Sequence, residues 1–328
     1  MFSRMRDHRG LDKALVKELN ACCAQESKFL PNKSGLKMME SSQSGVSAKC
    51  RDARVEELWG LTNFFGYSTQ TFVRAVNLMD RFLAGTKAKP EHVPCVSVCC
   101  LHLAAGVTEE AKDVAPVCEL IRISHSNFAM SDLRRMKTLV VQKLGPETPA
   151  VTAFTFLRLY YSALSAVCDD VRTEIPSVMT LEAQLKACLC RLVFSKAKPS
   201  LLALALVAYE IESLQCAAAS KMMQQMQKAT KVCDGDLRHW QYMVGKRMTE
   251  YRSAQCHKPN GRKLVWAVSK WTVQSTHGTL CTAPRLPTIH EDAWDHSLSE
   301  VDTNSGEDSP CGSLGSVGEG SFFPSSYL

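Results

Sequence analysis

The sequence predicts an all-α protein built from two consecutive groups of five helices. Three observations support this prediction. Apolar residues recur every three or four positions through almost all of residues 11–252, which is helical spacing. No segment of this region shows the strict alternation of apolar and polar residues that a half-buried strand requires. Finally, "LGPETPA" (144–150) carries two prolines, which end the first group of helices.

The expected helices follow one another with short breaks. An amphipathic segment at 11–29 comes first, and the Ser-rich stretch 35–49 after it is expected to be a loop. Glycine, proline or short polar runs then bound each of ten further helices, expected at 52–65, 69–85, 93–105, 113–122, 131–144, 152–167, 179–194, 200–214, 217–230 and 235–252. The stretch 200–214 is apolar nearly all round, which predicts a helix at the centre of the second group.

The stretch "FVRAVNLMDRFLAG" (72–85) contains a carboxylate in an unusual place. At 100° per residue, apolar side chains cover more than half of the helix, and the remaining polar strip holds Arg74, Asn77 and Arg81. Asp80 falls inside the apolar arc instead. A charge withdrawn from water costs several kcal/mol unless it is paired and hydrogen-bonded. Asp80 is therefore expected to have a cationic partner.

The cysteine pattern argues against metal and disulfide chemistry. The chain has 15 cysteines, but no two have the CxxC spacing of zinc and redox sites, and its nine histidines include no HxxxH pair. Several cysteines lie in apolar helical patterns, where a thiol packs as a small hydrophobe. No metal and no other cofactor is therefore expected, and the compartment is expected to be reducing, that is, the cytoplasm and nucleus.

Neither a secretory signal nor a membrane span is expected. The start, "MFSRMRDHRG", has charges but no apolar run behind it. The longest apolar run, "LLALALVAY" (201–209), falls well short of the roughly 20 residues that a membrane-spanning helix needs.

Charge is divided unevenly along the chain. The formal net charge is +6, yet no Lys or Arg follows Arg285, while eight acidic residues do. Residues 1–286 therefore carry +14 and the remainder −8. Because the basic residues are spread over many helices, their distribution favours an ordinary solvated surface over a continuous basic surface that binds nucleic acid.

Several motifs of the chain resemble the cyclin box. Arg51 stands 29 residues before Asp80, which lies in "DRFL". The stretches "KPEHVPCVSVCCLHLAAGVTEE" (89–110) and "SDLRRMKTLVVQKL" (131–144) are similar to the third and fifth helices of that box. Three more stretches are similar to the G-type cyclins: "LEAQLKACLCRLVFSKAKPSLLALALVAYEIESL" (181–214), "KLVWAVS" (263–269) and "LPTI" (286–289). The resemblance covers residues 11–290 and identifies the chain as a member of the cyclin family.

The resemblance implies five parts, which are tandem five-helix cyclin boxes with flanking segments. These are an N-terminal helix and Ser-rich loop (1–50), an N-terminal cyclin box (51–145), a C-terminal cyclin-like fold (150–255), an extension with an amphipathic helix (256–289) and a disordered acidic tail (290–328). The tail resembles that of the longer G-type member and the degradation-promoting segments of short-lived regulators. Within it, Ser309 precedes a proline and is a candidate phosphorylation site.

For Arg51 and Asp80 the resemblance implies an ion pair. In cyclins, an arginine at the start of the first helix pairs with the aspartate of the DRFL-type segment. A guanidinium group can engage a carboxylate through two parallel hydrogen bonds. This pair is expected to lock the first helix of the box against the second, as an architectural and not a catalytic feature.

The chain also departs from cyclins that activate kinases. Such cyclins carry a lysine at the end of the third helix and a glutamate in the fifth, where this chain has Gly106 and Lys137. These two positions, together with Glu109 and Glu110, are the candidate partner-facing residues. On the first helix, the apolar residues that recruit RxL-type substrate peptides are replaced by Cys, Ala, Arg and Glu within "CRDARVEE" (50–57). Docking of such peptides is not expected.

Two functions from different classes remain open at this stage. The first is a non-catalytic, atypical G-type cyclin that binds a cyclin-dependent protein kinase weakly, or a regulatory subunit of protein phosphatase 2A, and restrains the cell cycle. The second is a cyclin-fold helical module that binds nucleic acid or the transcription machinery. "GRKLVWAVSKW" (261–271) is basic and carries two tryptophans, but its apolar residues form an amphipathic stripe. No enzyme motif and no small-molecule substrate are indicated, and nucleic acid is the less favoured partner.

Overall fold

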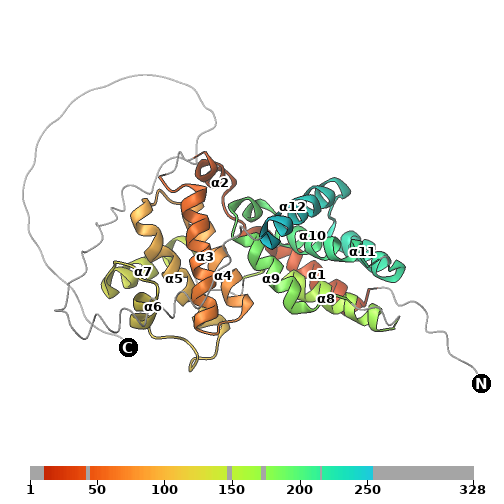
Figure 1. Cartoon of the computed structure of the whole chain (residues 1–328), viewed down its shortest axis with the longest axis horizontal. Coiled ribbons are helices and arrows are strands. Elements are labelled where there is room, and N and C mark those ends of the chain that lie inside the picture. The colour runs from red at the N-terminus through yellow and green to blue at the C-terminus, as the bar shows by residue number, and fades with distance from the viewer. Residues whose placement is uncertain (1–10, 42–44, 146–149, 171–174, 215, 254–328) are drawn as a thin grey trace, which may run out of the picture. The chain divides into compact units, whose positions relative to one another are not determined.

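The computed structural model describes residues 11–41, 45–145, 150–170, 175–214 and 216–253. Within these ranges the chain forms α-helices and short 3₁₀-helices and no strand, so the predicted all-α class is confirmed (Figure 1). All of these helices lie in one unit, Met1–Ile289.

The first group consists of the five expected helices. They are α3 (Ala48–Phe64), α4 (Thr69–Ala84), α5 (Val93–Thr108), α6 (Val117–Ile123) and α7 (Met130–Leu144), with a 3₁₀ turn η2 (Pro90–His92) before α5. Ser47 caps α3 and Ser68 caps α4. Each serine side chain accepts a hydrogen bond from the backbone amide three residues later. The helix α6 is shorter than predicted because Pro116 forms its N-terminal boundary.

The second group also has five helices, and its central one is the apolar stretch predicted for that place. They are α8 (Ala153–Asp170), α9 (Val178–Leu189), α10 (Pro199–Glu212), α11 (Ala217–Thr230) and α12 (Asp234–Arg252). Helix α10 packs against each of the other four. The prediction of a single helix over 179–194 is wrong, because α9 ends at Leu189 and the chain continues as the 3₁₀-helix η3 (Leu192–Lys196).

The segment before the first group contains more structure than the sequence predicted. It forms α1 (Lys13–Glu26), the 3₁₀ turn η1 (Ser27–Phe29) and α2 (Lys33–Glu40). The prediction of a loop over 35–49 is therefore wrong for residues 35–40, which belong to α2. Asn32 caps α2 by accepting from the amides of Ser34 (2.8 Å) and Gly35 (3.1 Å). The helix then buries Leu36 and Met39.

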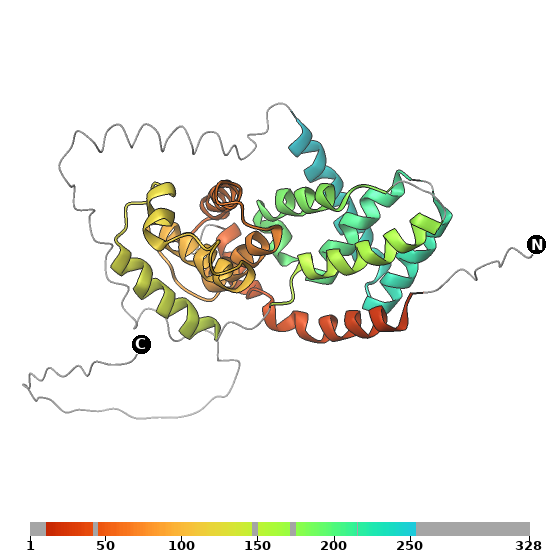
Figure 2. The same cartoon turned by 90° about the horizontal axis from the view of Figure 1, so that it is seen from below.

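This segment reaches both groups. Helix α1 packs against α8, α10 and α11 of the second group, and Figure 2 shows it in red along that group. Helix α2 packs against α4 of the first group and against η3. A Cβ on Gly35 would lie 1.9 Å from the carbonyl oxygen of Ala84, so the backbones of α2 and α4 are in direct contact there. We call residues 27–40 the strap.

One described stretch, Pro90–Thr108, has the length and mean hydropathy (1.2) that a membrane-spanning helix needs. Two-thirds of it (67%) is buried within the protein. Its apolar composition is accounted for by its place inside the first group, where α5 packs against α3, α4, α6 and α7.

Candidate partner-binding surface and the junction of the two groups

Arg51 and Asp80 form a bidentate, fully enclosed ion pair between α3 and α4. Arg51 Nε lies 2.8 Å from Asp80 Oδ1, and Nη2 lies 2.7 Å from Oδ2. The side chains are 0% and 2% exposed. Burial alone would lower the pKa of Arg51, but the charge and hydrogen bonds of Asp80 outweigh it and raise that pKa above its ordinary value. Arg51 is therefore charged at every physiological pH.

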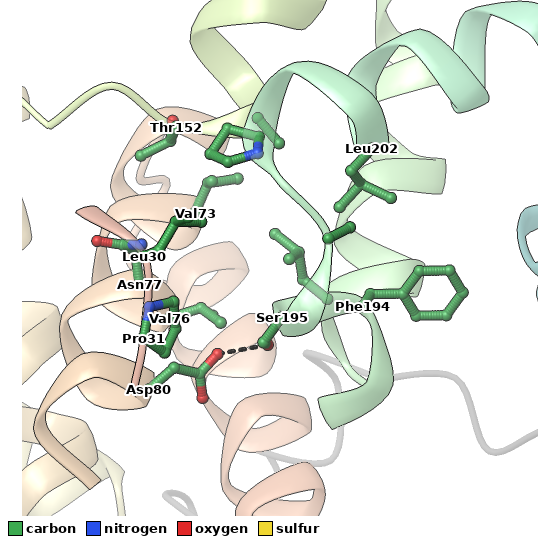
Figure 3. Close-up of a pocket in the computed structure, with 14 residues that line it drawn as sticks. Leu30, Pro31, Val73, Val76, Asn77, Asp80, Thr152, Phe194, Ser195 and Leu202 are labelled. Carbon is green, nitrogen blue, oxygen red and sulfur yellow. Dashed lines mark hydrogen bonds between the residues drawn. The ribbon is translucent and has the colours of Figure 1, made fainter. Parts of the chain in front are cut away.

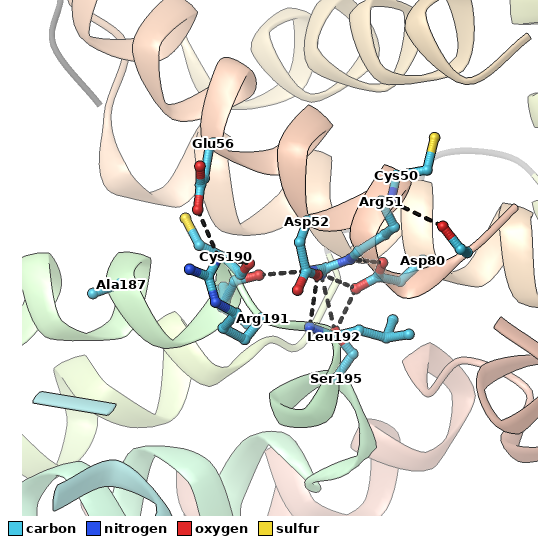
Figure 4. Close-up of polar contacts among 12 residues, drawn as sticks. Cys50, Arg51, Asp52, Glu56, Asp80, Ala187, Cys190, Arg191, Leu192 and Ser195 are labelled. Atoms are coloured by element: carbon cyan, nitrogen blue, oxygen red, sulfur yellow. Dashed lines mark hydrogen bonds and ion pairs between the residues drawn. The ribbon is translucent and has the colours of Figure 1, made fainter. Parts of the chain in front are cut away.

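The pair also reaches the second group, which the sequence did not indicate (Figure 4). Arg51 Nη1 donates to the carbonyl oxygen of Leu189, at the end of α9, over 2.7 Å. Ser195 Oγ, in η3, donates to Asp80 Oδ2 over 2.6 Å and accepts from Arg51 Nη2 over 3.1 Å. Both charges are thus satisfied only when the two groups are in contact.

Two neighbouring acids extend this contact. Asp52 accepts from Arg51 Nη1 (3.1 Å) and from the amide of Leu192 (2.9 Å). Burial raises the pKa of Asp52, although Arg51 and that amide both favour the carboxylate. One turn further along α3, Glu56 pairs with Arg191 at 2.6 Å. No local sequence signal identified Leu192 and Arg191 as partners, because they follow Asp52 and Glu56 by 140 and 135 residues.

Helix α9 meets the first group at two more places. Lys186 lies over the ring of Trp59, 5.6 Å from its centroid, and Tyr251 of α12 stacks on the same ring at a centroid distance of 5.9 Å. Burial lowers the pKa of Lys186. Closer to the start of α9, Glu182 accepts from the hydroxyl of Thr69 over 2.7 Å. Contacts with the first group therefore extend from Glu182 to Leu189 of α9.

The strap packs on the polar strip of α4 that the sequence predicted. Asn77 Nδ2 donates to the carbonyl oxygen of Phe29 (2.8 Å), and Arg81 lies over the Phe29 ring at 5.6 Å from its centroid. Arg74 is buried, with 5% of its surface exposed. The strap, whose Phe29 lies 48 residues before Asn77, therefore packs on this strip, and the sequence did not indicate this contact.

A small cavity lies where the strap, α4 and η3 meet (Figure 3). Its volume is about 50 Å³, and its lining includes Pro31, Asn77, Asp80, Phe194 and Ser195. Pockets that hold drug-sized ligands span about 300–1,000 Å³. The junction cavity is therefore too small for a substrate or an organic cofactor.

The structure brings two of the candidate partner-facing residues onto one surface. Gly106 is exposed on the last turn of α5, where a Cβ would meet no atom within 4 Å. His102, one turn earlier, has its pKa lowered by burial and by the positive charge of Lys137, which is exposed on α7. Helices α5 and α7 pack together. We call Gly106, Val107 and Lys137 the α5/α7 surface.

Glu109 has an internal role that sequence analysis missed. Its carboxylate accepts from the amide and the hydroxyl of Ser68 (2.8 Å each) and from the hydroxyl of Thr71. Burial would raise the pKa of Glu109, but the hydrogen bonds from Thr71 and Ser68 outweigh it and lower the pKa. Glu109 therefore ties the end of α5 to the start of α4. Glu110, in contrast, is exposed and pairs with Lys112 at 2.8 Å.

The outer face of α3 is polar and internally paired. Arg54 Nη1 lies 2.6 Å from Glu57 Oε2, and both Ala53 and Glu57 are exposed. Cys50, on the same helix, is partly buried, and that burial raises the pKa of its thiol. This face offers charge in place of the apolar surface that RxL-type peptides require.

Some predictions fall on parts of the chain that the structure does not describe. They are Ser309, the amphipathic segment 261–271, the extension 256–289 and the acidic tail 290–328. Among the residues that are described, no three His, Cys, Asp or Glu side chains gather closely enough to hold a metal ion.

Comparisons with known proteins agree with the geometry. Residues 18–148 match the family model "Cyclin, N-terminal domain". The chain is 44% identical to Cyclin-G2 of Mus musculus over 298 residues (90% of this chain, 86% of the relative) and 44% identical to Cyclin-G1 of Sus scrofa over 280 residues (84% and 95%). The fold is similar to the X-ray structure of a viral cyclin from herpesvirus saimiri (TM-score 0.56, 16% identity, 71% of this chain and 96% of that one). The chain therefore belongs to the cyclin family, as a G-type cyclin and a regulator of the cell cycle.

Proposed function

We propose that this protein is a non-catalytic regulatory subunit that binds a cyclin-dependent protein kinase weakly and stimulates it little. The contact is assigned to the α5/α7 surface, and a regulatory subunit of protein phosphatase 2A is the alternative partner. A cyclin that occupies a kinase without stimulating it restrains progression through the cell cycle. That is the direction of regulation we propose.

The observation that carries the proposal is the chemistry of Gly106 and Lys137. The first is exposed and has no side chain, and the second presents an exposed ammonium group. In typical kinase-activating cyclins, a lysine and a glutamate at the matching places donate to and accept from the kinase backbone. Charge-assisted hydrogen bonds of this kind contribute about 1.5–3 kcal/mol each. Losing both weakens binding by about two to four decades, at tenfold per 1.4 kcal/mol.

The test introduces the lysine and the glutamate of kinase-activating cyclins at these two positions, and we call these two side chains the kinase anchors. Purified wild-type protein and the double variant Gly106→Lys, Lys137→Glu are titrated calorimetrically with a purified cyclin-dependent kinase. We expect the double variant to bind at least tenfold more tightly. Because Val107 is also exposed (41%), Val107→Lys with Lys137→Glu tests whether the first anchor belongs one residue later. Lys221→Glu, on the exposed side of α11, is the matched charge-reversal control.

Two results would contradict the proposal. Tight binding and strong activation by the wild type would mean that other surfaces carry the kinase contact. Equal, weak kinase binding by all variants, together with tight binding of a purified phosphatase 2A regulatory subunit, would assign the protein to the alternative partner.

A further inference from the structure

Helix α12 has an exposed face that takes no part in the junction or in the α5/α7 surface. Arg238, His239, Tyr242 and Lys246 lie within an arc of about 100° on the helix, and all four are exposed. Tyr242 has 70% of its surface exposed, which is unusual for a large aromatic side chain. Figure 1 shows α12 along the upper edge of the second group. We call Arg238, Tyr242 and Lys246 the α12 stripe.

The two cations of the α12 stripe differ from the other basic residues of the same helix. Arg247 is buried and donates to the carbonyl oxygen of Ala187 over 2.9 Å, and Arg252 donates to the hydroxyl of Tyr209 over 3.3 Å. Within the part of the chain that the structure describes, Arg238 and Lys246 make no hydrogen bond or ion pair, and Tyr242 makes no ring contact. The two cations and the ring are thus available to a partner.

The dimensions of the stripe define what fits it. From Arg238 to Lys246 the helix rises by about 12 Å, at about 1.5 Å per residue, with Tyr242 midway. An extended peptide covers about 13 Å in four residues, and side chains two apart point to the same side. A segment with the pattern acid–x–apolar–x–acid therefore places two carboxylates over the two cations and one apolar side chain over the tyrosine ring.

We propose that the α12 stripe is a docking surface for an acidic, extended segment of a partner protein with this pattern. A short segment suits the stripe better than nucleic acid does. Binding of a nucleic acid strand needs a longer track of cations and several aromatic rings for successive bases. Helix α12 offers one exposed tyrosine ring with a cation on either side.

This surface is independent of the kinase contact proposed above. The α12 stripe lies in the second group, whereas Gly106, Val107 and Lys137 lie in the first. Substitutions in the α12 stripe are therefore expected to leave the affinity for the kinase unchanged. The double variant Gly106→Lys, Lys137→Glu is expected to leave peptide binding unchanged.

The experiment measures binding of a defined probe to the full chain. The probe is a fluorescein-labelled peptide in which Glu, Phe and Glu alternate with Ala, and binding is followed by fluorescence anisotropy at low and at physiological salt. The double variant Arg238→Glu, Lys246→Glu is compared with Lys17→Glu, Lys221→Glu, which makes the same charge change at exposed positions of α1 and α11. A thermal melt of each variant verifies that it is folded.

The proposal predicts that the stripe variant binds the probe at least about tenfold more weakly than wild type, whereas the control pair binds it as wild type does. Tyr242→Ala is expected to weaken binding by about fivefold. Three outcomes would overturn the proposal. They are no binding of the probe to wild type, equal loss in the stripe and control variants, and tighter binding of a labelled single-stranded oligonucleotide than of the peptide.

Discussion

The two five-helix groups share their element order but differ in where they bury charge. The first group buries ionised side chains on α3 and α4, with Arg51 and Asp80 at 0% and 2% exposure. The second group is built around α10, in which residues 199–208 are buried and contain no ionisable side chain. Buried charges need specific partners, whereas apolar side chains need only close packing.

The first group depends on the second to complete the hydrogen bonds of its buried charges. Arg51 and Asp80 satisfy one another only in part, and Leu189 and Ser195 of the second group complete their hydrogen bonds. The apolar centre of the second group has no corresponding need. Mutations in the network are therefore expected to destabilise the first group and the junction, while leaving the packing around α10 intact.

The largest effect is expected from Asp80→Ala, which leaves the guanidinium group of Arg51 buried beside fewer partners. Breaking a buried ion pair costs about 3–5 kcal/mol. Chemical denaturation measures the loss. Glu57→Ala, which removes the exposed pair with Arg54, is the matched control and is expected to cost at most about 1 kcal/mol. Similar losses from the two variants would show that the buried charges do not set the stability of the first group.

A smaller effect is expected from Ser195→Ala, which isolates the contribution of the junction. The variant keeps the bidentate pair within the first group and removes only the hydroxyl that donates to Asp80. Hydrogen bonds to charged groups contribute about 1.5–3 kcal/mol. Hydrogen exchange should show faster exchange in α3, α4 and η3 than in α10. An unchanged exchange pattern would mean that the groups are stable independently.

The strap provides a third test through Gly35→Ala. The added Cβ would meet the Ala84 carbonyl oxygen at 1.9 Å, so α2 must move away from α4. Overpacking of this kind costs about 1–3 kcal/mol. Gly106→Ala, where a Cβ meets nothing within 4 Å, is expected to be neutral or slightly stabilising. A thermal melt of Gly35→Ala that matches wild type would show that the strap tolerates displacement.

The smallest effect concerns pH and Glu109. Its hydrogen bonds lower the pKa in the folded state, so its contribution to stability is present at neutral pH and is lost as pH falls through the acid range. Glu109→Gln is therefore expected to destabilise the protein at neutral pH and to lose less stability than wild type on acidification. Denaturation curves at neutral pH and at about pH 4 measure this. Glu110→Gln, at a more exposed carboxylate, should follow wild type at both values.

Helical periodicity was enough to predict the two groups of five helices, because their apolar faces repeat at helical spacing. It also placed the apolar stretch around α10 at the centre of the second group. For Asp80, its place inside an apolar arc predicted that it needs a partner, and the family resemblance pointed to Arg51.

The misses have a common physical cause, which is contact between segments far apart in the chain. Helix α2 overlaps the Ser-rich stretch 35–49 and is held by burial of Leu36 and Met39 against other elements. Arg74 is buried, on a strip of α4 that the strap covers. Ser195 had no distinguishing pattern, since its importance comes only from the position of Asp80. Local spacing carries no information about such tertiary partners.

The placement of α1 has a consequence for synthesis of the protein on the ribosome. Leu11, just before α1, donates to Gln225, which is 214 residues later, and Glu26 accepts from Ser200, which is 174 residues later. At about 5–20 residues per second, the end of α1 waits roughly 10–35 seconds for its partner helix. Until α8 is made, none of the helices of the second group against which α1 packs is present. Nascent chains that stop before α8 therefore expose this face of α1, and we expect such chains to be bound by chaperones.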